Sequence, residues 1–373
     1  MSFSIGRIMG ITVRIHYTLW FVFLLIAWTL ASGYMPQEYP GLGIITYWSI
    51  GIASAILLFV SVLIHELSHS YIANKNNLPI KRITLFFFGG VSEMSKEPID
   101  PGLEIRMAAA GPLMSFLIAG VLGAIWFMTK NAGAPIILTA TLRYGALINA
   151  ILGAFNLLPA FPLDGGRVLR GSLWRRSKSL SDSTIKATRV AEYLAFTLMG
   201  LGLVFAIFGN FIGGIWLIFI GWFIKSGAEE SMQHTLVGEM LSGILVKDVM
   251  TKDVLTVPPE ITVEQLVSDY FLVHRHGSYP VLHDDEINGI ITMQCVRSIP
   301  KEKWSVTTVK DAMVPCERTI ILEPNVSALD AFNKMASENV GRILIASDNR
   351  LLGILTRGDL MRVIRAKQEL GLP

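Results

Sequence analysis

The chain has 373 residues, of which 52% are hydrophobic and only 16% are charged, whereas an ordinary soluble domain has about 25% charged residues. The charge is uneven: 28 of residues 1–230 are charged, about 12%, against 33 of residues 231–373, about 23%. This distribution excludes a single uniform globular domain, a disordered chain and a fibrous repeat. It indicates a membrane part followed by a soluble part that is large enough for its own core.

The net charge of +3 combines +6 in the membrane part with −3 in the soluble part. Since the soluble part is slightly acidic and has no run of lysine or arginine, no nucleic-acid partner is expected. The two cysteines, Cys295 and Cys316, both lie in the soluble part. Two isolated cysteines make neither a disulfide framework nor a zinc knuckle, which favours a reducing compartment.

Apolar runs long enough to cross a membrane, about 20 residues, define the membrane part. The uncharged gaps are 15–37, 39–65, 107–129, 144–163 and 193–224. The last gap is too long for one span, and Gly209-Asn210 breaks it near the middle. Dividing it into 189–208 and 211–228 gives six predicted spans. An N-terminal signal peptide fits less well, because the first apolar run is too long for one.

Basic residues of the loops fall mainly on one side of the membrane if there are six spans. They are Arg7, Arg14, Lys75, Lys81, Arg82, Lys96, Arg167, Arg170, Arg175, Arg176, Lys178 and Lys186. The positive-inside rule makes this side cytoplasmic. We therefore expect a multi-pass protein of the cell membrane with both termini and the soluble part in the cytoplasm. A five-span arrangement would place the soluble part and its two free cysteines outside the cell, which is less consistent with the reducing compartment that they favour.

The segment His65-Glu66-Leu67-Ser68-His69, at the end of the second span, has the H-E-x-x-H pattern. Histidines four residues apart share one helix face and can bind one zinc ion, and the glutamate beside the first can take a proton from a water on that ion. Ionisable side chains in a span are costly and mark functional sites. The alternative is a polar helix end that lies just outside the bilayer.

A catalytic zinc site needs a third protein ligand, and Asp164 is the best candidate. It follows Pro159 and Pro162, which end the fourth span in irregular backbone near membrane depth, where such backbone must line a cavity or pack in protein. The alternative role for Asp164 is a turn and a helix cap. Asn156 could hold a substrate carbonyl oxygen, or it could make a hydrogen bond between helices. His274 and His276 resemble a metal pair but are more typical of a solvated surface.

Together the H-E-x-x-H segment and the later N-x-x-P-x-x-P-x-D-G-G-R segment, residues 156–167, resemble the site-2 protease family of intramembrane zinc metalloproteases. The resemblance covers residues 1 to about 230. It implies zinc ligands at His65, His69 and Asp164, a general base at Glu66 and substrate positioning by Asn156. The segments 86–91, FFFGGV, and 109–112, AAGP, match further family features, the first of them a short β-structure between the second and third spans.

The expected substrate is a membrane-spanning helix, which must unwind before it can be cut because its backbone is fully hydrogen-bonded. Residues 82–88 are β-branched and aromatic and precede Gly89-Gly90, so they are predicted to form a strand and a turn. An exposed strand edge could take the unwound substrate by strand addition. The alternative is an interfacial aromatic hairpin without substrate contact.

The soluble part contains an internal repeat. Residues 246–250, VKDVM, match 309–313, VKDAM, and residues 288–292, NGIIT, match 352–356, LGILT. The pattern resembles a pair of CBS domains, about 246–303 and 304–370, after a linker at 231–245. The family resemblance implies an adenine nucleotide, such as ATP or AMP, with its ribose on Thr356 and Asp359. The first copy has Cys295 where an aspartate would stand, and Asp359 could instead cap a helix.

The sequence thus predicts a multi-pass α-helical membrane domain of about six spans with a short membrane-associated β-structure, plus a cytoplasmic α/β CBS pair. The predicted function is intramembrane zinc endopeptidase activity on membrane-spanning helices within the lipid bilayer, modulated by nucleotide or by homodimerisation through the CBS pair. One alternative is a CBS-gated channel or transporter, although the membrane halves show no internal symmetry. Another is an inactive metal-binding scaffold, although Glu66 is intact.

Overall fold

The computed structural model describes residues 2–78, 80–86, 89–94, 100–274, 276–284 and 286–370. The chain forms two compact units, Met1–Thr235 and Leu236–Pro373, and each is described by itself. Phe87, Phe88 and Lys96, which the sequence analysis used, lie outside the described residues.

Among the described residues, six helical segments are long and apolar enough to cross a membrane, as predicted. The first is Thr18–Glu38, which consists of α1 (Thr18–Thr29), η1 (Leu30–Tyr34) and α2 (Met35–Glu38). The others are α3 (Ile44–Lys75), α4 (Pro101–Asn131), α5 (Ile136–Asn156), α7 (Leu180–Ile207) and α8 (Phe211–Met240). The shorter α6 (Asp164–Ser177) follows the proline-containing loop.

The boundaries of the fourth span differ from the prediction of 144–163, because α5 begins at Ile136 and ends at Asn156. The prediction started the span after the charge of Arg143. In the structure Arg143 lies within α5, where its guanidinium pairs with Glu38 at the end of the first span. A charged residue that forms an ion pair can therefore lie within a membrane span and does not have to mark its end.

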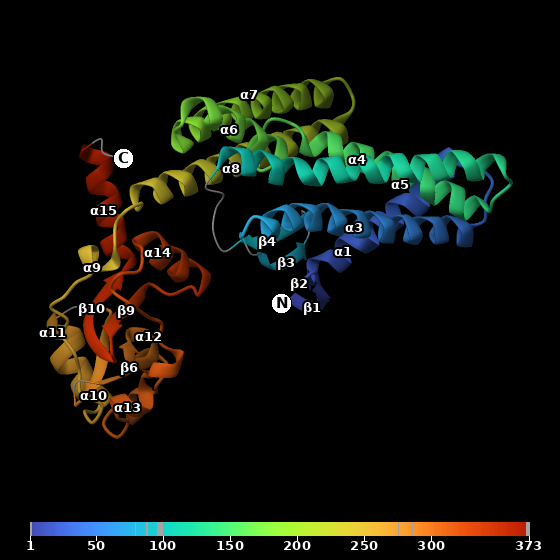
Figure 1. Ribbon diagram of the computed structural model, residues 1–373. Helices are drawn as coiled ribbons and strands as arrows, with labels where there is room; N and C mark the ends of the chain where they lie inside the picture. Colours follow the sequence, from blue (N-terminus) through green and yellow to red (C-terminus); the bar gives the residue numbers. More distant parts are fainter. Residues whose placement is uncertain are drawn as a thin grey trace. The chain divides into compact units, whose positions relative to one another are not determined.

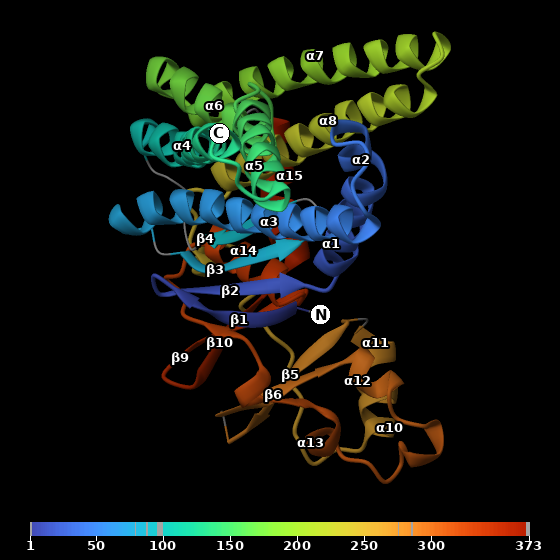
Figure 2. The same ribbon diagram turned by 90° about the vertical axis from the view of Figure 1, so that its right-hand side faces the viewer.

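A four-stranded sheet packs against α3 (Figure 2). Its strands are β1 (Ser2–Ile8), β2 (Ile11–His16), β3 (Ile80–Phe86) and β4 (Gly89–Met94), in that order. The apolar face of β2 and β3, including Ile11, Val13, Ile83 and Leu85, is buried. The described part of the predicted strand, residues 82–86 of β3, is therefore internal and pairs with β2 on one side and β4 on the other. The edges of the sheet are β1 and β4, because the N-terminal segment supplies two strands that were not predicted.

The second unit contains a sheet in which the two sequence repeats meet (Figure 1). The strand order is β5-β6-β10-β9-β8, and β7 pairs with β6. The strands are β5 (Ser278–His283), β6 (Glu286–Thr292), β7 (Val314–Pro315), β8 (Ile321–Leu322), β9 (Arg342–Ser347) and β10 (Arg350–Thr356). The repeated NGIIT and LGILT segments lie on β6 and β10, which are neighbours.

Short helices complete each repeat of the second unit. They are α9 (Val246–Val249), α10 (Val263–Gln265), η2 (Leu266–Phe271), α11 (Leu272–His274), α12 (Met293–Arg297), η3 (Lys301–Lys303), α13 (Val309–Ala312), η4 (Cys316–Arg318), α14 (Ala328–Ser337) and α15 (Arg357–Leu370). The repeated VKD segments form α9 and α13, whose first residues, Val246 and Val309, are both fully buried. Equal sequence thus gives equal local structure in both copies.

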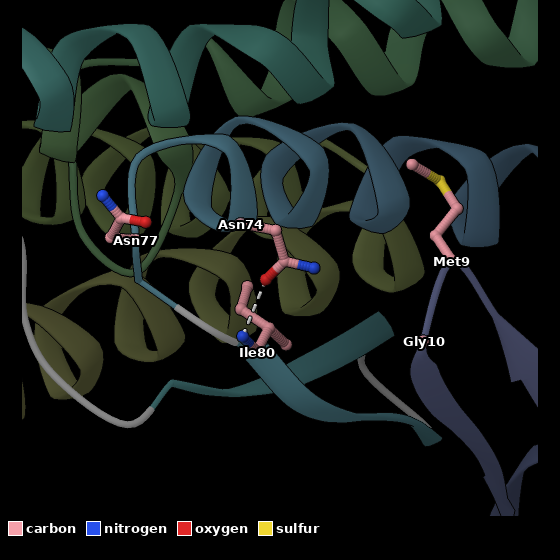
Figure 3. Close-up of a pocket in the computed structure, with 5 residues that line it drawn as sticks. All are labelled: Met9, Gly10, Asn74, Asn77 and Ile80. Carbon is pink, nitrogen blue, oxygen red and sulfur yellow. Dashed lines mark hydrogen bonds between the residues drawn. The ribbon is translucent and has the colours of Figure 1, made fainter.

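A cavity of about 470 Å³ opens between the turn that joins β1 to β2 and the C-terminal end of α3. Met9, Gly10, Asn74, Asn77 and Ile80 line it (Figure 3). Asn74 accepts a hydrogen bond from the main-chain N–H of Ile80 at 2.9 Å, which ties the end of α3 to the start of β3. None of the lining residues is titratable, and none is a candidate metal ligand.

Candidate metal centre

Three of the predicted site residues come together. The Nε2 atoms of His65 and His69 on α3 lie 3.1 and 3.2 Å from Oδ2 of Asp164, the first residue of α6. One ligand atom from each residue lies within 4.8 Å of the others. Within the described residues no other group of three histidine, cysteine or acidic side chains gathers in this way, so His274 and His276 belong to no such cluster.

The far side of each imidazole is held by α4. Nδ1 of His69 donates a hydrogen bond to the carbonyl oxygen of Met107 at 2.7 Å, and Nδ1 of His65 lies 2.9 Å from Oγ of Ser115. A carbonyl oxygen can only accept, so the proton of a neutral His69 sits on Nδ1 and Nε2 presents a lone pair. This is the arrangement that metal-binding histidines need.

Gly111 explains why the AAGP segment occurs beside the site. A Cβ atom at this position of α4 would lie 2.3 Å from Nε2 of His69 and 2.6 Å from Nε2 of His65. No side chain can occupy that space, so the backbone of α4 forms the wall against which both imidazoles stand.

Gly90 has a similar relation to Glu66. A Cβ atom on Gly90, in edge strand β4, would lie 2.4 Å from Cγ and 2.9 Å from Oε1 of Glu66. The absence of a side chain therefore lets the strand pass directly over the glutamate that follows the first histidine. The sequence pattern predicts only a turn at this glycine, so its contact with Glu66 is a finding of the structure.

The loop from 157 to 163 carries Asp164 to the histidines. It is irregular and includes a cis bond between Phe161 and Pro162. Gly165 and Gly166 allow α6 to start against this loop, because a Cβ would lie 2.3 Å from Leu157 O at the first and 2.5 Å from Ala160 C at the second. The N-cap of α6 is Leu163, so the carboxylate of Asp164 does not cap the helix but faces the imidazoles.

The donor set fits a zinc ion. Two imidazole nitrogens and one carboxylate oxygen are ordinary ligands of catalytic zinc, and three ligands leave a position for water. Burial by itself would raise the pKa of the Asp164 carboxyl, but its close contacts with the His65 and His69 rings outweigh burial and lower this pKa to about 2. The carboxylate is therefore ionised at neutral pH, as a metal ligand must be.

Asn156 does not join this cluster in the structure. It is the last residue of α5, and its side-chain amide donates to the carbonyl oxygen of Leu152 at 2.9 Å. A different asparagine, Asn149, is fully buried and joins α5 to α3 through Oγ of Ser61 at 3.0 Å. Sequence reasoning missed Asn149, although a polar residue within an apolar run was a usable signal.

In the second unit Thr356 and Asp359 form a helix cap. The Asp359 carboxylate accepts hydrogen bonds from N–H and Oγ1 of Thr356, and the N–H of Asp359 donates back to Oγ1. The other carboxylate oxygen pairs with Arg362. In the first copy Thr292 caps α12 by accepting from the N–H of Cys295 at 3.3 Å. The pair of Thr356 and Asp359 thus fulfils the capping role given above as the alternative to ribose binding.

Comparison with known proteins decides the family. The profile of peptidase family M50 matches residues 53–136 and 128–201, and the CBS domain profile matches residues 246–300 and 309–366. Zinc metalloprotease MJ0392 of Methanocaldococcus jannaschii is 32% identical over 99% of this chain and 99% of its own length. The chain belongs to peptidase family M50. Rip3 of Mycobacterium tuberculosis is 33% identical to this M50 chain over 97% of it and 93% of the relative.

A solved structure of the site-2 protease from Methanocaldococcus jannaschii is 35% identical, with a TM-score of 0.41 over 62% of this chain and 95% of that one. The M50 chain is a metalloendopeptidase of the site-2 protease type that uses zinc, and it is a multi-pass membrane protein with tandem CBS domains. The family therefore favours the protease over the alternative of a CBS-gated channel or transporter.

Proposed function

We propose that this M50 protein cuts membrane-spanning helices at a centre in which His65, His69 and Asp164 hold one zinc ion. The observation that carries the proposal is the convergence of these three side chains, from α3 and α6, with both imidazoles oriented by α4. Ninety-nine residues separate His65 from Asp164 along the chain. Two imidazole nitrogens and one carboxylate oxygen at this spacing are a suitable set of ligands for one cation.

The zinc ion, when bound, polarises the carbonyl of the scissile peptide and makes the attacking water more acidic. Glu66, one residue after the first histidine, accepts the proton of that water and passes it to the leaving nitrogen as the peptide bond breaks. Asn156 donates its amide to the carbonyl oxygen as negative charge develops there. For this, the amide must leave its present acceptor, the carbonyl of Leu152.

The substrate is presented by edge strand β4 rather than by β3. Within the part of the chain that the structure describes, residues 89–94 pair with β3 alone, which leaves their other edge available to a further strand. Gly90 on this strand lies directly against Glu66. An unwound substrate segment paired to β4 would satisfy its backbone hydrogen bonds while passing close to the general base.

The experiment is co-expression of the full chain with single-span candidate substrates, comparing the wild-type protein with Glu66→Gln. The amide cannot accept the proton, so cleavage should fall at least a thousandfold while zinc content stays the same. Glu229→Gln is the matched control, because Glu229 makes only an i,i+4 pair with Lys225 on α8. Equal cleavage by the wild-type and Glu66→Gln proteins would overturn the mechanism.

Both termini and the CBS pair lie in the cytoplasm in this proposal. The support is the distribution of basic residues in the loops. Arg170 does not count among them, because it is buried in an ion pair with Glu104. The other basic residues still favour the same side. A C-terminal reporter that is active only in the cytoplasm tests the orientation, and an inactive fusion at normal expression would contradict it.

We further propose that the CBS pair modulates cleavage by binding an adenine nucleotide or by forming a homodimer. The support is the presence of Thr356 and Asp359 in the second copy and the CBS profile matches over residues 246–300 and 309–366. Titration of ATP and AMP into the full chain tests this, with Asp359→Asn as the comparison. Nucleotide affinity that is unchanged in Asp359→Asn would argue against the ribose contact, and a mass that stays monomeric would argue against the dimer.

A further inference from the structure

An ion pair is buried inside the first unit, between Glu104 on α4 and Arg170 on α6. Arg170 donates from Nε to Oε1 of Glu104 at 2.7 Å, and its Nη2 bonds the same oxygen. The exposed fraction is 0% for Glu104 and 6% for Arg170. A buried ion pair is often no more stabilising than apolar residues of the same size, so stability alone does not account for this one.

The two helices that the pair joins are the ones that build the metal centre around α3. Helix α6 begins with Asp164, six residues before Arg170. Helix α4 carries Met107, the acceptor of His69, three residues after Glu104, and it also carries Ser115 beside His65. The ion pair therefore connects the helix of the third ligand to the helix that orients the first two.

Close backbone packing fixes the same junction. A Cβ atom on Gly171, next to Arg170, would lie 2.8 Å from Cγ1 of Ile105, next to Glu104. The helices are thus in contact at the level of the ion pair, and a change in the pair must be transmitted to the start of α6 because interiors are packed as densely as crystals.

Arg170 also contacts two other parts of the unit. Its guanidinium lies 5.4 Å from the ring centroid of Phe161, in the loop that precedes Asp164, and its Nη1 lies 3.4 Å from Oγ1 of Thr235 on α8. The Arg170 side chain thus contacts both the loop that precedes Asp164 and helix α8, which follows it in the chain. The second oxygen of Glu104 has no hydrogen-bond partner among the described residues, so Arg170 supplies most of what balances this charge.

We propose that Glu104 and Arg170 are positioning residues that hold Asp164 against the two histidines and thereby set how firmly the centre retains zinc. This inference rests on the ligand set of the proposed function. Groups that orient metal ligands commonly change metal affinity 10- to 100-fold when they are removed. Neither residue touches the ligand atoms, so the pair acts through the placement of α6.

The test is the full-length chain in detergent, with Glu104→Met and Arg170→Met combined. Replacing both partners by apolar side chains avoids leaving one buried charge unpaired, so the double variant should fold with nearly the wild-type unfolding midpoint. We expect zinc to pass to a chromophoric chelator at least tenfold faster than from the wild-type protein, and the visible absorption of the cobalt-substituted centre to change. A release rate within twofold of wild type and an unchanged cobalt spectrum would overturn the proposal.

If the double variant does not fold, a second pair of variants tests the positioning role of Arg170. Thr235→Val removes one contact of Arg170 and keeps the shape of the side chain, and we expect about threefold faster zinc release. Thr188→Val is the matched control, a buried threonine whose Oγ1 bonds Ala228 O at 3.4 Å. Equal release rates from the two valine variants would then count against the proposal.

The ligand set is tested in parallel with His69→Ala. Loss of zinc from this variant supports the ligands on which the inference rests. Stoichiometric zinc in His69→Ala would mean that the proposed ligand set has failed, whereas normal zinc retention in the methionine double variant would mean that only the positioning role has failed.

Discussion

The carbonyl oxygen of Met107 accepts a hydrogen bond from Nδ1 of His69 at 2.7 Å. This contact joins two membrane helices and leaves Nε2 of the same ring facing Asp164 at 3.2 Å. A main-chain acceptor cannot be removed by substitution, so the orientation of His69 depends on how closely α4 approaches α3. Several consequences of that approach can be measured.

Gly111→Ala should abolish zinc binding without unfolding the protein. The new methyl group would lie 2.3 Å from Nε2 of His69, so either the ring must turn away from Asp164 or the helices must separate. We expect zinc content, measured by atomic absorption, to fall from one ion per chain to less than a tenth. Gly120→Ala on the same helix is the control, since its added methyl group meets nothing within 4 Å. Full zinc content in Gly111→Ala would contradict the geometry.

Gly90→Ala should impair cleavage but not zinc binding. Its methyl group would lie 2.4 Å from Cγ of Glu66 and push the carboxylate out of position. We expect at least a hundredfold lower cleavage rate with one zinc per chain retained. Gly6→Ala, in edge strand β1, has open space at its Cβ and should cleave normally. A normal rate in Gly90→Ala would show that Glu66 is not constrained by β4.

Ser115→Ala should weaken zinc binding moderately. The hydroxyl lies 2.9 Å from Nδ1 of His65, and without it that ring nitrogen is buried with no partner. We expect about tenfold lower zinc affinity in competition with a chelator. Ser49→Ala is the matched control near the start of α3, where the half-buried hydroxyl donates to the carbonyl oxygen of Ile45. Identical affinities for both variants would exclude an orienting role for Ser115.

Asp359→Ala should loosen the last helix of the second unit whether or not nucleotide binds. It removes the carboxylate that accepts hydrogen bonds from the N–H and Oγ1 of Thr356 at the start of α15, and the loss of such a cap costs about 1 kcal/mol. Amide hydrogen exchange over residues 357–370 of the full chain should therefore become about fivefold faster. Asp253→Ala, an exposed position, serves as control. Unaltered exchange in Asp359→Ala would show that this cap does not stabilise α15.

Chelation of the metal should destabilise the first unit selectively. The ion would bridge α3 and α6, and an ion that binds only the folded state stabilises it by mass action. We expect a chelator to lower the unfolding midpoint of the wild-type protein by several degrees. The same treatment should leave His69→Ala unchanged. A similar shift in both proteins would assign the effect to something other than this centre.

Much of the fold was predictable because its causes are local. Membrane helices must satisfy their hydrogen bonds within the segment and must be apolar, so uncharged apolar runs, the last divided at Gly209-Asn210, located six spans. The boundaries were less predictable where a charge had a distant partner, as Arg143 has in Glu38. The N-terminal hairpin of β1 and β2 was missed although its own pairing is local, and the pairing of β2 with β3 is long-range and leaves little trace in local composition.

The residues of the candidate site likewise fall into those that the sequence predicted and those that only the structure revealed. His65, Glu66 and His69 could be found from spacing, because residues four apart share a helix face. Asp164 was found from its proline-rich surroundings and from family resemblance. The contributions of Ser115 and Arg170 could not be found, since a serine in an apolar helix and an arginine in a basic stretch look ordinary until their partners are known.

By itself the sequence determined which residues carry charge or metal-binding chemistry, which segments are apolar enough to lie in lipid, and that two related copies make up the soluble part. Only the tertiary structure decided that the carboxylate of Asp164 meets the two imidazoles, that Gly111 and Gly90 leave room for the side chains opposite them, and that Glu104 reaches Arg170. The physical reason is that hydropathy and helix periodicity act over neighbouring residues, whereas contacts between helices depend on packing across gaps of tens of residues in the chain.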